Sequence, residues 1–201
     1  YTRGLRDFHN LYVKMLLIKV ISSPDQILID MACGKAGDLS KWVNAKLSFV
    51  FGVDLSPDNI ENRLDGACAR YLKLKRENKR IPGALFVIGN SGYNIRNGEA
   101  MKNEKSKQIT KSVFGSIAKD KKLGKAVEKY HGIGENGFDV CSCQFAVHYF
   151  FQDKQVLNRF LKNVAECTKL GGYFIGTCYD GKKIFNKLKD KKRGEEMELY
   201  V

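Results

Sequence analysis

Five short apolar runs punctuate the chain, and each is continuous instead of alternating with polar residues. They span residues 27–31, 49–54, 84–88, 138–143 and 172–177. Continuous runs of this kind are typical of strands that are buried on both faces of a parallel sheet. The pattern therefore predicts five strands at these positions.

Helical patterns of apolar residues occupy the intervals between the runs. Helices are predicted over residues 11–21, 39–45, 57–78 and 155–168. Ser56 and Pro57 have the N-cap and first-turn chemistry of a helix start, and Gly171-Gly172 is predicted to end the last helix. Helices that alternate with strands through short connections indicate an α/β fold with a doubly wound, mostly parallel sheet.

The interval from Asn90 to Gly137 breaks this alternation, because it has no strand-like run and is too long for an ordinary connection. We expect it to be a Lys-rich insertion, with a helix over residues 112–130, inside a single domain that spans residues 1–201. Its lysines are Lys102, Lys105, Lys107, Lys111, Lys119, Lys121, Lys122, Lys125 and Lys129. They form either a solvated charged face or a surface that contacts a nucleic-acid backbone.

The composition is that of a basic protein with a packed core. Lys and Arg number 35 against 22 Asp and Glu, and the net charge of +13 favours a polyanionic partner such as nucleic acid. Hydrophobic residues make up 43% of the chain, which excludes wholesale disorder. No apolar run approaches the roughly 20 residues of a membrane span, so no membrane partner is expected. Six scattered cysteines without a Cys-x-x-Cys pair, and three distant histidines, predict an intracellular protein without a metal site.

The first strand leads into a turn of small residues, from Asp30 to Asp38, that contains Gly34 and Gly37. Such a turn lets a ligand approach the backbone closely. The dinucleotide fingerprint needs three glycines and a Walker loop needs Gly-Lys-Ser/Thr, so both phosphate-binding interpretations are disfavoured. A carboxylate with two glycines instead suits the sulfonium and amino-acid tail of S-adenosylmethionine.

Polar residues also follow the second and third strands. Asp54 comes about twenty residues after the glycine turn, where a carboxylate can accept both ribose hydroxyls of a nucleoside. N-capping of the next helix is the alternative role, although Ser56 already serves there. Asn90 and Ser91 lie at the same edge of the sheet and are expected to contact adenine, unless they serve only as turn residues.

The fourth strand ends in Gln144-Phe145-Ala146-Val147-His148-Tyr149, at the edge where open α/β sheets bind ligands. Phe145 and Tyr149 can stack on a planar base, and His148 can hydrogen-bond its edge. A single histidine here is more often structural. The cluster beside a cofactor turn indicates a base-binding site instead.

Four segments carry a family resemblance. They are residues 5–14 (LRDFHNLYVK), 32–38 (ACGKAGD), 141–149 (CSCQFAVHY) and 171–177 (GGYFIGT). On these motifs the chain resembles the mRNA cap guanine-N7 methyltransferases over nearly its whole length outside the insertion. The combination of Gly-Lys-x-Gly-Asp with Gln-Phe-x-x-His-Tyr is specific. Differences from the common cellular pattern suggest a viral or divergent capping enzyme.

The resemblance implies a Rossmann-like class I methyltransferase that transfers a methyl group from S-adenosylmethionine to N7 of the guanosine cap of mRNA. The implied cofactor-binding residues are Lys14, Asp30, Gly34, Asp54, Asn90, Ser91 and Gln144. The implied cap-binding residues are Asn10, Lys35, Asp38, Arg63, Phe145, His148 and Tyr149. No residue is expected to act as an acid or a base, because guanine N7 has a free lone pair and no proton. Phe145, His148 and Tyr149 are expected to position the guanine.

The resemblance also carries departures and further expectations. The family usually has an acidic residue where Asn90 stands, so an amide is expected to contact adenine. The chain ends at Val201, before the family's closing strands and a late cap-binding glutamate, so those strands are expected to be missing. The implied partners are the capped 5′ end of mRNA and other capping-enzyme domains or subunits. The implied location is the nucleus for a cellular enzyme and the cytoplasm or a viral factory for a viral one.

Two other functions remain open at this point. The first is a methyltransferase that acts on a small molecule, a protein or another RNA position. The second is a non-catalytic basic RNA-binding module with a vestigial cofactor pocket. The intact set of Gly34, Asp54 and Gln144 argues against the second.

Overall fold

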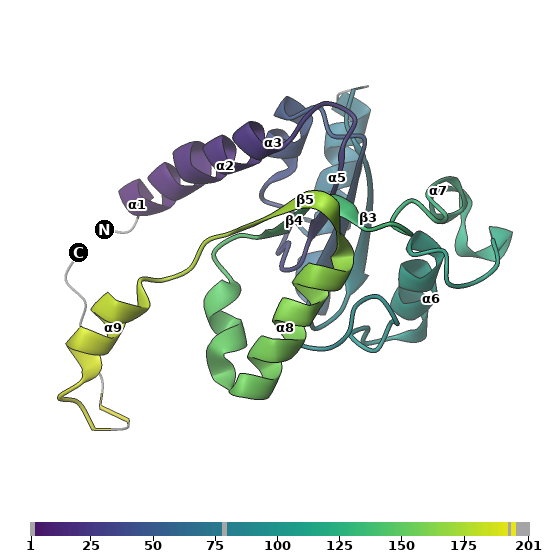
Figure 1. Cartoon of the computed structure of the whole chain (residues 1–201). Helices are drawn as coiled ribbons and strands as arrows, with labels where there is room; N and C mark the ends of the chain where they lie inside the picture. Colours follow the sequence, from purple (N-terminus) through teal and green to yellow (C-terminus); the bar gives the residue numbers. More distant parts are fainter. Residues whose placement is uncertain (1–2, 78–79, 193, 196–201) are drawn as a thin grey trace.

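The computed structural model describes residues 3–77, 80–192 and 194–195. Its centre is a five-stranded sheet with the order β3-β2-β1-β4-β5, in which every neighbouring pair is parallel (Figure 1). The strands are β1 (Ile27–Asp30), β2 (Phe49–Asp54), β3 (Gly83–Ile88), β4 (Phe138–Cys143) and β5 (Thr168–Gly176). The predicted doubly wound parallel sheet is confirmed, and its strand order reverses between β1 and β4.

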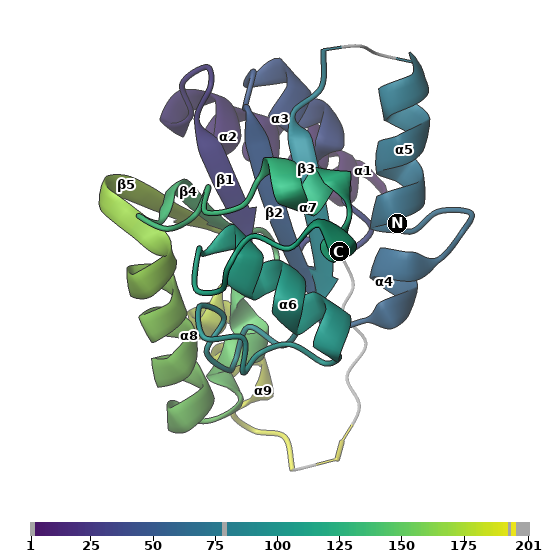
Figure 2. The ribbon, with the colours of Figure 1, turned by 90° about the vertical axis from the view of Figure 1, so that its right-hand side faces the viewer.

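Helices cover both faces of this sheet (Figure 2). The helical elements are α1 (Arg3–Asp7), η1 (Phe8–Val13), α2 (Lys14–Ile21), α3 (Leu39–Asn44), α4 (Pro57–Glu61), α5 (Ala67–Glu77), α6 (Glu104–Val113), η2 (Lys121–Leu123), α7 (Lys125–Lys129), η3 (Val147–Gln152), α8 (Lys154–Cys167) and α9 (Gly181–Leu188). Leu28 and Val50 belong to the core shared with α2, α3, α4 and α5. Ile29 and Phe51 belong to the core shared with α6, α7 and α8. Successive residues therefore bury their side chains on opposite faces, which explains the continuous apolar runs.

The leading helix is longer than predicted and contains an irregular turn. The helical segment extends from Arg3 to Ile21 instead of starting at residue 11, and η1 within it is a π-helix. There the backbone N–H of Lys14 donates to the carbonyl of His9, five residues earlier. Single π-turns inside α-helices are rare, and they occur frequently at functional sites.

The helix predicted over residues 57–78 is broken in two. Ser56 caps α4 as expected, because its hydroxyl accepts the Asn59 N–H at 3.3 Å. The side-chain oxygen of Asn62 then accepts the backbone N–H of Leu64 and ends the helical run after one short segment. A Cβ on Gly66 would lie 2.7 Å from the Asn62 backbone, so this tight turn requires glycine. An asparagine turn therefore overrides the helical pattern.

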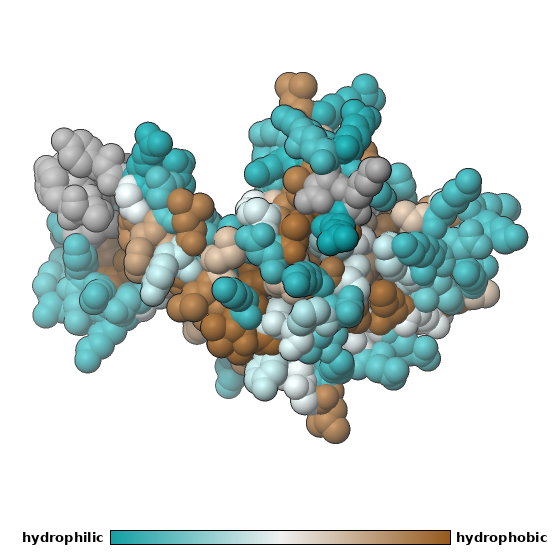
Figure 3. Space-filling model, turned by 90° about the horizontal axis from the view of Figure 1, so that it is seen from above, coloured by the Kyte–Doolittle hydropathy of each residue, from teal (hydrophilic) through white to brown (hydrophobic). Residues whose placement is uncertain are grey.

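The connection between β3 and β4 also differs from the prediction. Its main helix, α6, lies at residues 104–113 instead of 112–130, and only η2 and α7 occupy the rest of the predicted range. Asn103 caps α6 by accepting the Ser106 N–H at 2.8 Å, and Gly115, with φ of +69°, follows its end. The predicted helix followed the lysine-rich pattern and did not take these capping residues into account. The end of the molecule that carries α7, on the right in Figures 1 and 3, is mostly hydrophilic.

The Gly171-Gly172 pair does not end the last predicted helix. α8 ends at Cys167, where Thr168 becomes extended and its hydroxyl donates to the Val164 carbonyl at 2.6 Å. The two glycines lie inside β5, where the pairing with β4 shifts register. A Cβ on Gly172 would lie 2.8 Å from the Asp139 carbonyl oxygen. The glycine therefore allows a close strand approach at an irregularity in the sheet.

In the three described ranges, no helix is both long enough and apolar enough to cross a membrane. The same ranges hold no group of three or more His, Cys, Asp or Glu side chains placed to bind a metal ion.

Candidate active site

The turn after β1 is fastened directly to the end of β2. Gly34 has φ of +54°, in the left-handed region that favours glycine, and its N–H donates to Oδ2 of Asp54 at 2.8 Å. The Cys33 N–H donates to the Val53 carbonyl at 3.0 Å. These bonds hold two strand ends and their connecting loops in one arrangement.

Asp54 is buried and accepts three hydrogen bonds. Besides Gly34, the Ser56 N–H donates to its Oδ1 at 3.0 Å and the Asn59 side-chain amide does so at 2.9 Å. The residue is 9% exposed. Its carboxylate is therefore held in a fixed orientation at the edge of the sheet.

A cavity of about 610 Å³ lies at the carboxyl ends of β1 to β4, where the strand order reverses. Open α/β sheets bind their ligands at this switch point. Of the predicted site residues, the cavity is lined by Gly34, Asp54, Asn90, Ser91, Gln144, Phe145 and Tyr149. The structure thus brings together residues that are up to 115 positions apart, since they follow four different strands.

The polar residues of this cavity already have partners within the protein. The Ser91 hydroxyl donates to the Met31 carbonyl at 2.6 Å, and the Asn90 side-chain oxygen accepts the Gly92 N–H at 2.9 Å. The Gln144 amide nitrogen donates to the Ser142 hydroxyl at 3.3 Å. The cavity wall is therefore fixed before any ligand binds.

A buried charge network lies next to the cavity. Asp38 pairs with Lys14 at 3.3 Å and with Lys41 at 2.9 Å, and Lys41 was not predicted. Burial, together with the nearby charge of Asp38, raises the pKa of Asp30 to about 7. The network connects α2 and α3 to the first turn of the site.

Aromatic side chains gather beside the cavity. The ring of His148 lies 4.4 Å from that of Tyr149, 5.7 Å from that of Phe145 and 4.5 Å from that of Tyr179. His148 Nδ1 is buried without a hydrogen-bond partner among the described residues, and burial lowers the pKa of this side chain. Tyr149 and Tyr179 are 70% and 52% exposed. The cluster therefore presents the exposed rings of Tyr149 and Tyr179 to a planar ligand.

Three predicted residues lie outside this arrangement. Lys35 does not line the cavity and pairs with Asp65 at 2.8 Å and with Asp58 at 3.0 Å. Arg63 is exposed in the turn between α4 and α5, instead of on a helix as predicted. Asn10 is half-buried in η1.

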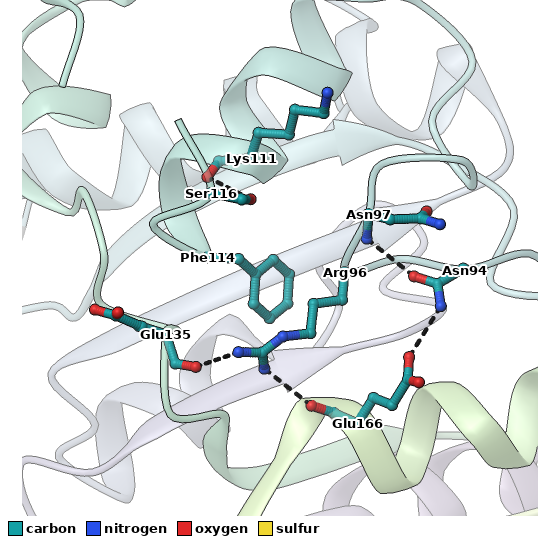
Figure 4. Close-up of a pocket in the computed structure, with 8 residues that line it drawn as sticks. All are labelled: Asn94, Arg96, Asn97, Lys111, Phe114, Ser116, Glu135 and Glu166. Carbon is teal, nitrogen blue, oxygen red and sulfur yellow. Dashed lines mark hydrogen bonds between the residues drawn. The ribbon is translucent and has the colours of Figure 1, made fainter. Parts of the chain in front are cut away.

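A second cavity, of about 730 Å³, is larger but has a structural explanation (Figure 4). The guanidinium of Arg96 lies over the Phe114 ring at 5.2 Å and donates to the backbone carbonyls of Glu135 and Glu166. The Asn94 amide donates to the Glu166 carboxylate at 2.9 Å. These bonds fasten the β3–β4 connection to the end of α8, which leaves the main donors of this cavity engaged.

Besides Lys41, three residues of the site region were not found from the sequence: His9, Thr177 and Tyr179. The Phe145 ring lies 4.9 Å from both His9 and Tyr179, and Thr177 hydrogen-bonds the Phe145 backbone at 2.7 Å. Tyr179 follows the last strand, and position at a strand end was the signal that could have identified it.

Residues 3–200 match the family described as the mRNA (guanine-N(7))-methyltransferase domain. The "Probable mRNA-capping enzyme" of Acanthamoeba polyphaga mimivirus is 31% identical over 190 residues, which cover 94% of this chain and 15% of that protein. The mRNA cap guanine-N(7) methyltransferase 1 of Arabidopsis thaliana is 30% identical over 184 residues, which cover 90% of this chain and 40% of that protein. The chain therefore spans less than half the length of either relative.

A solved structure shares the fold. An S-adenosylmethionine-dependent methyltransferase from Clostridium acetobutylicum matches with a TM-score of 0.52 and 14% identity, over 91% of this chain and 54% of that one. The expected Rossmann-like methyltransferase fold is confirmed. Since the family match covers almost every residue, the chain belongs to the mRNA (guanine-N(7))-methyltransferase domain family.

Proposed function

We propose that this protein transfers a methyl group from S-adenosylmethionine to N7 of the guanosine cap of mRNA. The observation that carries the proposal is the contact between the cavity at the switch point and the aromatic cluster. Phe145 and Tyr149 line the cavity at the switch point, and they also contact His148 in the aromatic cluster. A nucleoside-type cofactor and a purine base can therefore bind side by side.

The cavity residues fit S-adenosylmethionine. Asp54 is a fixed carboxylate of the kind that binds ribose hydroxyls, and Asn90 and Ser91 offer amide and hydroxyl groups to the adenine. Gly34 keeps the turn open, since apart from its two chain neighbours no heavy atom of the described residues lies within 4 Å of the position of its missing Cβ. Gln144 completes the wall. Lys14 and Asp30 do not line the cavity: Lys14 pairs with Asp38, and Asp30 accepts the Ala32 N–H in the turn after β1. When bound, the cofactor supplies a methyl group on a cationic sulfur.

The aromatic cluster is proposed to hold the guanine. Phe145 and Tyr149 offer ring faces for stacking, and His148, which contacts both rings, is proposed to hydrogen-bond the base edge. Guanine N7 has a free lone pair, so the chain needs to supply no acid or base. Holding the two reactants in line can contribute roughly 7–11 kcal/mol to such a reaction.

The remaining predicted residues are proposed to guide the cap. Asp38 orients Lys14 at 3.3 Å, and Asn10 lies on the same leading helix. Lys35 and Arg63 are proposed to meet the cap triphosphate, which requires Lys35 to exchange its carboxylate partners for phosphate. The lysines of residues 90–137 are proposed to attract the RNA backbone.

The setting of the activity is also a proposal. We propose that residues 1–201 form one methyltransferase domain that works with other capping-enzyme domains or subunits on the capped 5′ end of mRNA. An intracellular location fits this substrate: the nucleus for a cellular enzyme, or the cytoplasm or a viral factory for a viral one.

A methyl-transfer assay on paired transcripts tests the proposal. The protein is incubated with labelled S-adenosylmethionine and either a guanosine-capped RNA or the same RNA with a 5′ triphosphate. We expect label on N7 of the capped RNA alone, and competition by free cap analogue. Equal labelling of the uncapped RNA, or cofactor binding without transfer to the cap, would overturn the assignment of the substrate.

A further inference from the structure

The hydroxyl of Thr177 lies where three distant segments meet. Thr177 follows β5, and its Oγ1 lies 2.7 Å from the Phe145 backbone nitrogen, which belongs to the loop after β4. The same oxygen lies 3.1 Å from Nε2 of His9 in the π-turn and 3.3 Å from Oε1 of Gln144. Three polar groups therefore converge on one side-chain atom.

The directions of these hydrogen bonds follow from the chemistry of each group. A threonine hydroxyl has one proton to donate and two lone pairs that accept. The amide oxygen of Gln144 only accepts, so Thr177 donates its proton there. The Phe145 N–H only donates, and His9 therefore donates its Nε2 proton to the second lone pair. Burial, followed by the charge of Lys14, lowers the pKa of His9, which agrees with a neutral ring.

The bond to Phe145 holds a strained residue. Phe145 has φ of +58°, and residues other than glycine rarely adopt this left-handed conformation, which costs roughly 1–3 kcal/mol. The conformation directs the chain from the buried Gln144 to the exposed Phe145 ring, which contacts His148 and Tyr179. The ring of His9 also packs against this ring at 4.9 Å.

We propose that Thr177 is a positioning residue. Its hydroxyl fixes the Phe145 backbone, and His9 supports both the hydroxyl and the ring. The leading helix is thereby connected to the pocket for the methyl-accepting base. This inference rests on the proposed function for the identity of the base, but the hydrogen-bond junction itself can be measured without any activity.

Three threonine variants test the junction. Thr177→Val removes the hydroxyl at nearly constant volume, and Thr177→Ser keeps it. Thr168→Val is the matched control, because this threonine lies at the other end of β5 and its hydroxyl donates to the Val164 carbonyl. We expect Thr177→Val to lower kcat/KM for capped RNA about 10- to 100-fold, because small misplacements of reacting groups are costly. Ser should restore most of the loss, and the control should leave the rate unchanged.

A direct measurement accompanies the kinetics. The Phe145 amide proton should resonate downfield in the ¹⁵N-labelled protein, because its bond to Thr177 is short. The Val variant should move this signal upfield and weaken cap-analogue binding more than S-adenosylmethionine binding. A merely structural role would lower thermal stability without weakening cap-analogue binding more than S-adenosylmethionine binding.

Two histidine variants test whether His9 belongs to the same hydrogen-bond junction as Thr177. His9→Phe keeps an aromatic ring but removes the donor, and His9→Gln keeps a donor but removes the ring. We expect His9→Phe to weaken cap-analogue binding in the wild-type background and to add little in the Thr177→Val background, since residues of one network are not additive. Full additivity would show that His9 acts separately and would overturn its part in the junction.

The outcomes distinguish this inference from the proposed function. If the wild-type protein fails to methylate capped RNA, the proposed function fails, while the Phe145 amide signal still decides whether the junction exists. If capped RNA is methylated but Thr177→Val matches Thr168→Val in rate, amide shift and cap-analogue binding, the positioning role is wrong.

Discussion

The two halves of the candidate site are built in different ways. In the cofactor half, Asp54, Ser91 and Gln144 are all less than 10% exposed, and each is hydrogen-bonded within the protein. In the aromatic half, the rings of Phe145 and Tyr149 are 40% and 70% exposed. The first half is made by consecutive strand ends, whereas the second is assembled from separate segments.

This difference indicates that the halves have different tasks. A preformed polar wall can recognise the same cofactor in every cycle without reorganisation. The exposed rings of Phe145 and Tyr149 complete their stacking contacts only when a planar ligand arrives. We therefore expect variants in one half to leave binding in the other half largely intact.

The largest effect is expected in the cofactor half. Asp54→Ala removes the acceptor of three hydrogen bonds and leaves the Gly34 N–H unpaired. We expect the Kd for S-adenosylmethionine to rise at least about 100-fold, since bonds to a charged group contribute about 1.5–3 kcal/mol each. Calorimetry measures this, with Asp120→Ala at an exposed helix cap as the control. An unchanged Kd would remove Asp54 from the cofactor site.

The converse result, loss of methyl transfer without loss of cofactor binding, is expected from a substitution in the aromatic half. His148→Ala should lower methyl transfer to capped RNA about 100-fold by loss of base orientation, while binding of S-adenosylmethionine survives. His131→Ala is the control, because this histidine bonds Ser112 away from the site. Full turnover of capped RNA by the His148 variant would contradict the comparison.

A smaller effect separates stability from binding. Because the pKa of Asp30 is raised to about 7 in the folded protein, the folded state holds a proton that the unfolded chain releases near pH 4. Stability from this group is present below about pH 4 and is lost as the pH rises towards 7. Asp30→Asn should abolish this loss of unfolding free energy, which is on the order of a few kcal/mol between pH 4 and 7. Urea unfolding between pH 4 and 8 measures it, and an unchanged slope would assign the dependence to other groups.

The smallest effect concerns the helix cap beside Asp54. Ser56→Ala removes the side-chain acceptor of the Asn59 N–H but keeps the Ser56 backbone bond to Asp54. We expect a loss of about 1 kcal/mol in unfolding free energy and little change in cofactor affinity. A large loss of affinity would show that Ser56 belongs to the site.

The sequence was sufficient for the sheet and for the polar residues that gather at its edge. Continuous apolar runs identify buried parallel strands, and polar residues at their ends necessarily meet at one edge. Asp54, Asn90 and Gln144 are found in this way, and all three line the cavity.

The aromatic half and the helix ends were less predictable. His9 and Thr177 are 168 positions apart, and nothing local to either residue indicates the other. The break between α4 and α5 depends on the side-chain turn at Asn62, which a helical pattern of apolar residues does not reveal. Local competition and long-range contact thus account for the errors.

Because of the π-turn, the number of residues between His9 and Lys14 in the leading helix is itself a requirement. His9 bonds Thr177 on one side of the turn, and Lys14 pairs with Asp38 on the other. Removing one residue between them would restore a regular α-helix but rotate one anchor by about 100° relative to the other. Substitutions at the exposed Leu11 and Tyr12 should be tolerated, whereas a single-residue deletion or insertion beside them should not. The spacing of the two anchors, more than the residues between them, is what this segment must preserve.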